Sequence, residues 1–288
     1  MSSAVELRAQ GPFGIPPLLA RLVDDAALFP PGNATMADAV REHLAGRAGR
    51  RAGVIGLFLC TASRLPELIT ELIKAKPPTP IGLSLVVDTG LGGLPKAVSI
   101  VESRTELLAL RMVEMPAPSD VDEVWLERVD EFVPEDAVRV VEPRRGGKGW
   151  LDGVRRVADR GYWPKLRCGG QSAEAFPSLD HVADFLDVLA GSGASFKATS
   201  GLHSAVRHTD ERTGFTHHGF LNLLVATARA LSGGDVKEAL ATEDGPALAN
   251  EAAELTDDAA RAVRGVFASY GSGSLSEPVA DLEKLGLL

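Results

Sequence analysis

The chain has 288 residues, of which 45% are hydrophobic and 24% charged, and its formal net charge is −9. This composition excludes the disordered, collagen-like and disulfide-scaffold classes, and the negative charge without a basic tail disfavours a nucleic-acid partner. The length allows two domains or one large barrel, and we predict a single barrel domain over residues 1–288.

Cysteine usage and apolar run length predict the compartment. Cys60 and Cys168 are the two cysteines, too few for a disulfide framework and typical of a reducing compartment. The apolar runs fall far short of the roughly 20 residues that a membrane span needs, and the polar segment 1–10 is unlike a signal peptide. We expect a cytoplasmic protein, monomeric or homo-oligomeric, with a small-molecule substrate and no membrane partner.

Short runs of apolar and β-branched residues recur along the chain and start 25 to 32 residues apart. Helical spacing of apolar residues separates them, for example over Leu65–Ile73 and Phe220–Leu231. This alternation predicts parallel strands joined by helices, because each connection must cross back over the sheet. The predicted strands are Ala26–Phe29, Val54–Cys60, Ile81–Val87, Leu108–Val113, Ala137–Val141, Tyr162–Leu166 and Ala194–Ala198.

The eighth unit is ambiguous from sequence alone. Val266–Tyr270 fits a strand, whereas Ala259–Phe267 fits a helix equally well. Seven or eight equivalent units nevertheless favour an α/β fold of the (β/α)8 TIM-barrel type, complete or distorted at the eighth strand, over an open doubly wound sheet. Residues 235–288, rich in Ala, Leu and Glu, are expected to form a helical extension packed on the barrel.

Ionisable residues stand where the predicted strands end, which is where barrel enzymes hold their active sites. Gathered at one mouth, they indicate an active site or, alternatively, a structural ring of ion pairs. They are Asp24, Asp25, Cys60, Asp88, Glu114, Glu142, Lys165, Arg167 and Lys197.

Lys165 and Lys197 are the most informative of these residues, because each interrupts an apolar strand. A lysine in a barrel strand points into the crowded interior or must be paired. Burial and a neighbouring cation would lower its pKa, and the neutral amine could then attack a carbonyl to form a Schiff base. The alternative is a buried salt bridge to Glu114 or Glu142.

Two short segments resemble a known enzyme family. Phe196-Lys-Ala-Thr-Ser-Gly201 is similar to the strand-end element of deoxyribose-phosphate-type class I aldolases, and Lys165-Leu-Arg-Cys-Gly-Gly170 resembles that family's second lysine strand. The resemblance implies a Schiff-base lysine at position 197. The segment Asp24–Asn33 resembles an uncharacterised bacterial family, which implies no activity.

Four of the six histidines lie in the long connection between Gly201 and Gly219. Loops of this length in compact folds are usually functional or disordered. We predict a hairpin of residues 206–209 against 215–218, which would bring His208 near His217. The alternative metal site would use His203, His208, His217 and Asp88 as ligands of a divalent ion.

Glycine-rich and basic loops at the mouth predict an anion site, because backbone N–H groups at late barrel loops often bind phosphate. There is no dinucleotide fingerprint and no P-loop, so nucleotide cofactors are not indicated. The candidate anion-binding residues are Arg167, Gly169, Gly170, Thr199, Ser200, Arg207, Ser272 and Ser274.

The leading hypothesis is a lyase or isomerase, aldolase-like, that acts on a small carbonyl substrate, phosphorylated or carboxylated, without a cofactor. Lys197 is the predicted nucleophile, Lys165 would depress its pKa and bind the anion, and Glu142 or Glu114 with His203 would move protons. A metal-dependent hydrolase or aldolase that uses the loop 203–218 is one alternative. A non-catalytic ligand-binding barrel is the other.

Overall fold

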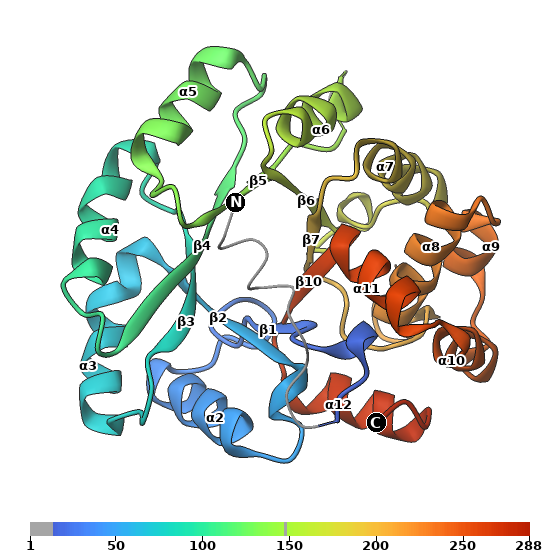
Figure 1. The fold of residues 1–288 in the computed structure, drawn as a ribbon, viewed down its shortest axis with the longest axis horizontal. Helices are drawn as coiled ribbons and strands as arrows, with labels where there is room; N and C mark the ends of the chain where they lie inside the picture. The colour runs from blue at the N-terminus through green and yellow to red at the C-terminus, as the bar shows by residue number, and fades with distance from the viewer. Residues whose placement is uncertain (1–13, 147–148) are drawn as a thin grey trace.

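Eight parallel strands close into a barrel in the computed structural model, which describes residues 14–146 and 149–288. The segment 1–10 examined for a signal peptide lies outside these residues. The strands follow the order β1-β10-β7-β6-β5-β4-β3-β2 around the barrel (Figure 1). Their bounds are β1 Val23–Asp25, β2 Ile55–Thr61, β3 Ile81–Val86, β4 Leu108–Pro116, β5 Val138–Glu142, β6 Trp163–Arg167, β7 Phe196–Thr199 and β10 Phe267–Ser272.

Helices alternate with the strands and surround the barrel (Figure 1). This arrangement confirms the predicted (β/α)8 TIM-type fold. The helices are α2 Met36–Ala48, α3 Leu65–Ala75, α4 Leu94–Glu102, α5 Glu123–Phe132, α6 Trp150–Asp159, α7 Leu179–Ser192, α8 Phe220–Ser232, α9 Val236–Ala241, α10 Gly245–Glu254, α11 Asp257–Val266 and α12 Ser276–Lys284.

The helices form where an apolar stripe meets a capping residue. In α3, Leu65, Leu68 and Leu72 are fully buried at helical spacing, and Pro66 occupies the first turn, where no N–H partner is needed. The α7 helix begins at Ser178, whose hydroxyl accepts a hydrogen bond from the backbone N–H of His181. The apolar faces of the helices pack against the outside of the barrel.

The first strand is shorter and earlier than predicted. It covers Val23–Asp25, whereas Ala26–Phe29, the predicted strand, forms the turn that follows it. Two of the three strand residues are aspartates, both buried, so the apolar run that follows them resembles a buried strand more than the strand itself does. Each carboxylate contacts a residue distant in the sequence: Asp24 lies 2.6 Å from Lys197 Nζ, and Asp25 lies 3.1 Å from His43 Nδ1.

The ambiguity at the eighth strand resolves into two adjacent elements. Helix α11 ends at Val266, and β10 begins at Phe267 and pairs with both β7 and β1. The barrel is therefore complete, although the register of β10 on β7 shifts between Phe267 and Ser269. The segment 235–288 supplies extra helices as expected, but it also contributes the strand that closes the barrel.

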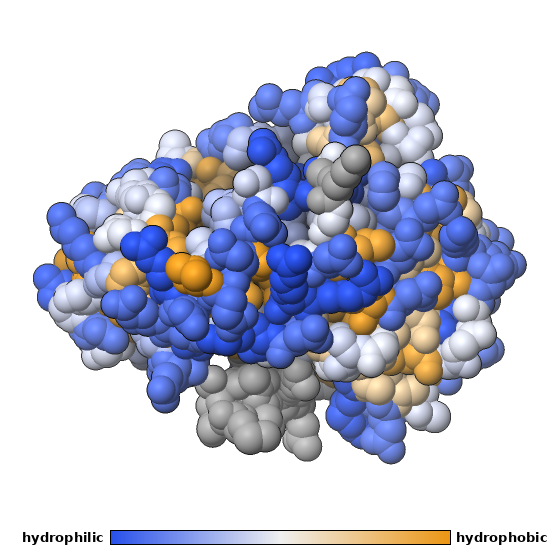
Figure 2. Space-filling model, turned by 90° about the horizontal axis from the view of Figure 1, so that it is seen from above, coloured by the Kyte–Doolittle hydropathy of each residue, from blue (hydrophilic) through white to orange (hydrophobic). Residues whose placement is uncertain are grey.

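A hairpin interrupts the connection between β7 and α8, as the sequence predicts. Strand β8, His208–Thr209, pairs antiparallel with β9, Thr216–His217, and His208 lies opposite His217. The face of the molecule in Figure 2 is largely hydrophilic with small separate apolar patches. Across residues 14–146 and 149–288, no helix combines the length and apolar character needed to cross a membrane.

Candidate functional site

The side chain of Lys197 lies in the barrel interior. It projects from β7, and its Nζ lies 2.6 Å from Glu114 Oε1 on β4 and 2.6 Å from Asp24 Oδ2 on β1. Neither strand is a neighbour of β7, so both contacts cross the interior. Lys197 therefore links β7 to β1 and β4 across the interior.

Both carboxylates that hold Lys197 receive further hydrogen bonds. Ser84 Oγ donates to Glu114 at 2.5 Å, and Ser269 Oγ donates to Asp24 at 2.7 Å. The backbone N–H of Leu57 donates to the other oxygen of Asp24 at 2.6 Å. Both oxygens of Asp24 and Oε1 of Glu114 thus accept hydrogen bonds, whereas Oε2 of Glu114 accepts none among the described residues and is balanced by the charge of Lys165, 2.8 Å away.

Lys165 extends this chain of charges toward the C-terminal ends of the strands, here called the mouth. Its Nζ lies 2.8 Å from Glu114 Oε2 and 3.4 Å from Glu142 Oε2. Glu142, the last residue of β5, also accepts a 2.6 Å hydrogen bond from Arg167 Nε at the end of β6. We call the alternating set Asp24, Lys197, Glu114, Lys165, Glu142 and Arg167 the lysine cluster.

Exposure increases along the lysine cluster. The side chains of Lys197 and Glu114 are 0% exposed, that of Lys165 is 9%, and those of Glu142 and Arg167 are 20% and 46%. The cluster therefore leads from the closed interior to the mouth, and Lys165 is the inner group that lies nearest to solvent.

Pairing controls the protonation of the cluster. Burial by itself lowers the pKa of Lys197, but the charges of Asp24 and Glu114 outweigh it, and the pKa of Lys197 is raised. Burial raises the pKa of Glu114, yet Lys165 and Lys197 hold it well below its usual range. The predicted lowering of the Lys197 pKa is thus wrong, because two buried carboxylates oppose the neighbouring lysine.

The candidate anion-binding residues of the β6 and β7 loops meet at the mouth. Arg167 donates to Ser200 Oγ at 3.0 Å while it pairs with Glu142. A Cβ on Gly169 would lie 2.8 Å from the Cα of Gly201, so the glycine permits close contact between the two loops. Thr199 ends β7 beside them, and Gly170 follows in the β6 loop.

The other three candidates have structural contacts of their own. Ser272 Oγ donates to the Ser274 carbonyl at 2.7 Å, and Ser274 Oγ accepts from the backbone N–H of Glu277 in the first turn of α12. The half-buried Arg207 donates its backbone N–H to Asn222 Oδ1.

The loop histidines stack on one another. The rings of His208 and His217 lie 5.2 Å apart, and His203 lies 6.2 Å from His217. Asp88 accepts hydrogen bonds from the hydroxyl and backbone N–H of Ser63. Among the described residues, no three His, Cys, Asp or Glu side chains are arranged to hold a metal ion, so the predicted ligand set does not assemble there.

His203 is partly buried beside this histidine stack. Burial, followed by the charge of His217, lowers its pKa. The two thiols are also buried, and burial raises the pKa of both Cys60 and Cys168 to about 12, so neither is an activated nucleophile.

The sequence places both aspartates among the ionisable residues of the mouth, but it names only Glu114 and Glu142 as partners of the lysines and misses the pairing of Asp24 with Lys197. A lysine inside a strand demands a partner, yet the partner depends on strand register and cannot be read from spacing. Gly56, a glycine inside an apolar strand, is the sequence feature that corresponds to this contact. A Cβ there would lie 2.1 Å from Asp24 Oδ1, so the glycine leaves room for that carboxylate.

Comparison with models of known protein families finds no match, and no curated protein shows significant sequence similarity.

Proposed function

We propose that the chain is a lyase or isomerase that acts on a small carbonyl substrate through an imine on Lys165. The observation that carries this proposal is the position of Lys165 between Glu114 and Glu142, at the boundary of the buried and exposed parts of the lysine cluster. An amine flanked by carboxylates at the mouth of a barrel can combine nucleophilic and acid–base roles. The proposed chemistry uses side chains alone and requires no metal or organic cofactor.

Lys165 is more accessible to a substrate than Lys197, the residue that the sequence favours as the nucleophile: the side chain of Lys165 is 9% exposed and that of Lys197 is 0%. Lys197 is fully buried and held by two carboxylates that raise its pKa. In the proposed mechanism Lys197 is a positioning residue: its charge keeps Glu114 ionised, and that carboxylate orients the Lys165 ammonium. Lys165 remains the group that a substrate entering from the mouth meets first.

The reaction begins when Lys165 passes its proton to Glu142. The free amine attacks the substrate carbonyl carbon, and the carbonyl oxygen leaves as water to give a protonated imine. This imine draws electrons from the neighbouring carbon, so a C–C bond or a C–H bond beside it can break. Glu142, after losing its proton to the departing water, accepts the proton released in that step.

Arg167 gives the mouth a role in substrate binding. In the free protein, Glu142 balances the charge of Arg167 and accepts a 2.6 Å hydrogen bond from its Nε. Once Glu142 is protonated, Arg167 requires another anion, and a carboxylate or phosphate on the substrate supplies it. Ser200, 3.0 Å from the guanidinium, is placed to bind the same group.

Borohydride trapping tests the proposal without knowledge of the substrate. The protein is incubated with a panel of short aldehydes and 2-keto acids, reduced, and examined by intact mass spectrometry. We expect a single covalent adduct in the wild type and none in Lys165→Arg, which keeps the positive charge but cannot form an imine.

The exposed lysine variant Lys74→Met is the matched control and should retain the adduct, because Lys74 pairs with Glu71 on the surface of α3. Equal labelling of the wild type and Lys165→Arg across the whole panel would refute the proposal and favour the non-catalytic ligand-binding barrel.

A further inference from the structure

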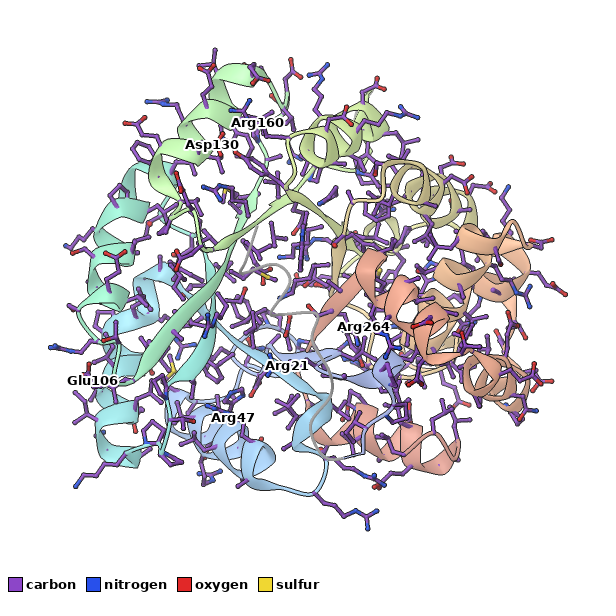
Figure 3. The ribbon with its side chains drawn as sticks, in the orientation of Figure 1. Arg21, Arg47, Glu106, Asp130, Arg160 and Arg264 are labelled. Carbon is purple, nitrogen blue, oxygen red and sulfur yellow. The ribbon has the colours of Figure 1, made fainter. Side chains whose placement is uncertain are left out.

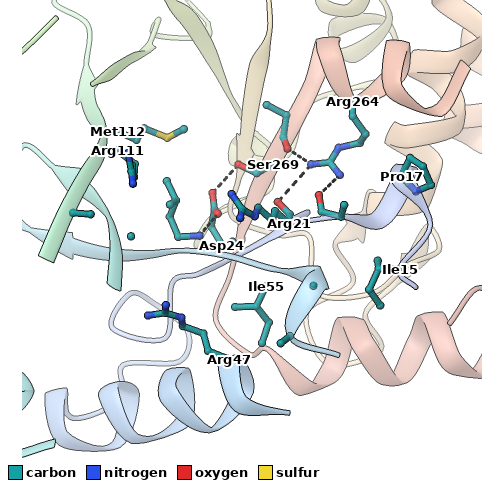
Figure 4. A pocket seen from close by; sticks show the side chains of 18 of the residues that line it. Ile15, Pro17, Arg21, Asp24, Arg47, Ile55, Arg111, Met112, Arg264 and Ser269 are labelled. Atoms are coloured by element: carbon teal, nitrogen blue, oxygen red, sulfur yellow. Dashed lines mark hydrogen bonds between the residues drawn. The ribbon is translucent and has the colours of Figure 1, made fainter. Parts of the chain in front are cut away.

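A cavity of about 670 Å³ lies at the N-terminal ends of the barrel strands, opposite the mouth (Figure 4). Its wall includes residues from the starts of several strands, such as Ile55 of β2, Gly82 of β3 and Trp163 of β6. We call it the arginine cavity, because five arginines line it: Arg21, Arg47, Arg111, Arg261 and Arg264.

These arginines gather from separate parts of the chain. Arg21 precedes β1, Arg47 belongs to α2, Arg111 to β4, and the other two to α11 (Figures 3 and 4). The chain as a whole carries a net charge of −9, so this local excess of positive charge runs against its average.

The two carboxylates of the cavity wall do not neutralise this excess. Asp24 is paired with Lys197 at 2.6 Å, and Asp257 lies 3.8 Å from Arg261. Within the part of the chain that the structure describes, Arg21, Arg47 and Arg111 form no ion pair. Three guanidinium groups thus face one cavity without a carboxylate partner.

The charges of Arg47 and Arg21 repel each other. Burial, and after it the charge of Arg21, lowers the pKa of Arg47. Arg21 has a φ of 49°, a left-handed conformation that non-glycine residues seldom adopt, and its N–H donates to the Gly53 carbonyl at 2.7 Å. An anion would relieve the repulsion between these groups.

Arg264 fixes the segment that carries Arg21. Its guanidinium donates to the carbonyl oxygens of Leu18 at 3.1 Å, of Ala20 at 2.6 Å and of Arg21 at 3.5 Å. Figure 4 shows hydrogen bonds of Arg264 beside Arg21 at the edge of the cavity. The backbone that carries Arg21 is therefore held in place before any ligand arrives.

We propose that the arginine cavity binds a small phosphorylated molecule at a site separate from the mouth. Guanidinium groups match the geometry of phosphate oxygens and bind them through paired hydrogen bonds. The cavity volume is that of a small-ligand pocket, and Ile15, Pro17 and Met112 provide an apolar wall for the organic part of the ligand. This inference does not depend on imine chemistry at Lys165.

Calorimetric titration with glycerol phosphate, at constant ionic strength and with glycerol as the neutral blank, tests this site. We expect saturable binding to the wild type that weakens at least about tenfold in the double variant Arg21→Gln/Arg111→Gln, because both guanidinium donors are removed. Both side chains belong to exposed residues, so the double variant should fold, and its melting temperature checks this.

Arg128→Gln, on the exposed face of α5, is the matched control and should bind glycerol phosphate within about twofold of the wild type. Arg167→Gln is measured separately, because the proposed function places an anion site at the mouth. Absence of saturable binding to the wild type, or unchanged affinity in the double variant, would overturn the proposal. Loss of binding in Arg167→Gln alone would overturn it too, because the phosphate would then bind at the mouth.

Discussion

Substitution of Lys197 by methionine should destabilise the protein more than any surface lysine substitution. It removes two buried ion pairs and leaves the carboxylates of Asp24 and Glu114, 2% and 0% exposed, without this cation. Breaking a buried pair costs about 3–5 kcal/mol. Glu114 retains Lys165, and Asp24 retains Ser269, so we expect the lower end, about 3 kcal/mol at neutral pH.

The loss should depend on pH in a defined direction. In the wild type the pKa of Glu114 is lowered, so its stabilising contribution is present above the unfolded pKa and is lost as pH falls below it. In Lys197→Met, Glu114 keeps only the cation of Lys165, so its pKa is lowered less and it contributes less to stability. The stability gap between wild type and variant should therefore narrow as the pH falls from about 7 to about 3, through the unfolded pKa of Glu114.

Urea unfolding at the two pH values measures this effect, with Lys74→Met expected to change stability by less than about 0.5 kcal/mol. In a double-mutant cycle, Asp24→Asn should reduce the cost of Lys197→Met by at least about 1 kcal/mol, because it removes one of the stranded charges. A cost below about 1 kcal/mol, or one that is equal at both pH values, would refute this explanation of the lysine cluster.

Three further variants test the surrounding structure. Burial lowers the pKa of His218 to about 4, so the free energy of unfolding should fall by roughly 3 kcal/mol as the pH drops from about 6.5 to 4. His218→Gln should flatten the curve of unfolding free energy against pH in that window, and an unchanged curve would contradict this. Arg264→Lys should cost about 2–3 kcal/mol, because an ammonium cannot reproduce the contacts of a guanidinium with five carbonyl oxygens, and an unchanged urea midpoint would argue against that role. Gly201→Ala should cost about 2 kcal/mol or more in thermal unfolding, since φ is 73° and a Cβ would lie 2.8 Å from the Cys168 carbonyl oxygen. The control Gly191→Ala should be neutral or slightly stabilising, because a Cβ there meets nothing within 4 Å. Equal effects of the two substitutions would refute the steric explanation.

The barrel could be predicted because strands covered on both faces require continuous apolar runs, and these recur with the period of a βα unit. The first strand was misplaced for the same reason. Val23–Asp25 is buried, because Asp24 pairs with Lys197 and Asp25 shares a hydrogen bond with His43, and local sequence patterns do not reveal these distant partners. The eighth strand was ambiguous because helix and strand meet at Val266 and Phe267 without a turn between them.

The candidate site could be predicted only in part. Lys165 and Lys197 are conspicuous in the sequence because a charge within an apolar strand requires a partner. Which carboxylate serves each lysine depends on the side-chain directions of β1, β4 and β5, which only the folded barrel defines. The arginine cavity has no local sequence motif, since residues 21, 47 and 111 become neighbours only when the barrel closes.

Peptide mapping after borohydride reduction tests the central proposal most directly. The wild-type protein is trapped with the carbonyl compound that labels it fastest, digested, and sequenced by mass spectrometry. We expect one reduced adduct, on Lys165. An adduct on Lys197, or labelling spread over exposed lysines such as Lys74, would contradict the assignment of Lys165 as the nucleophile.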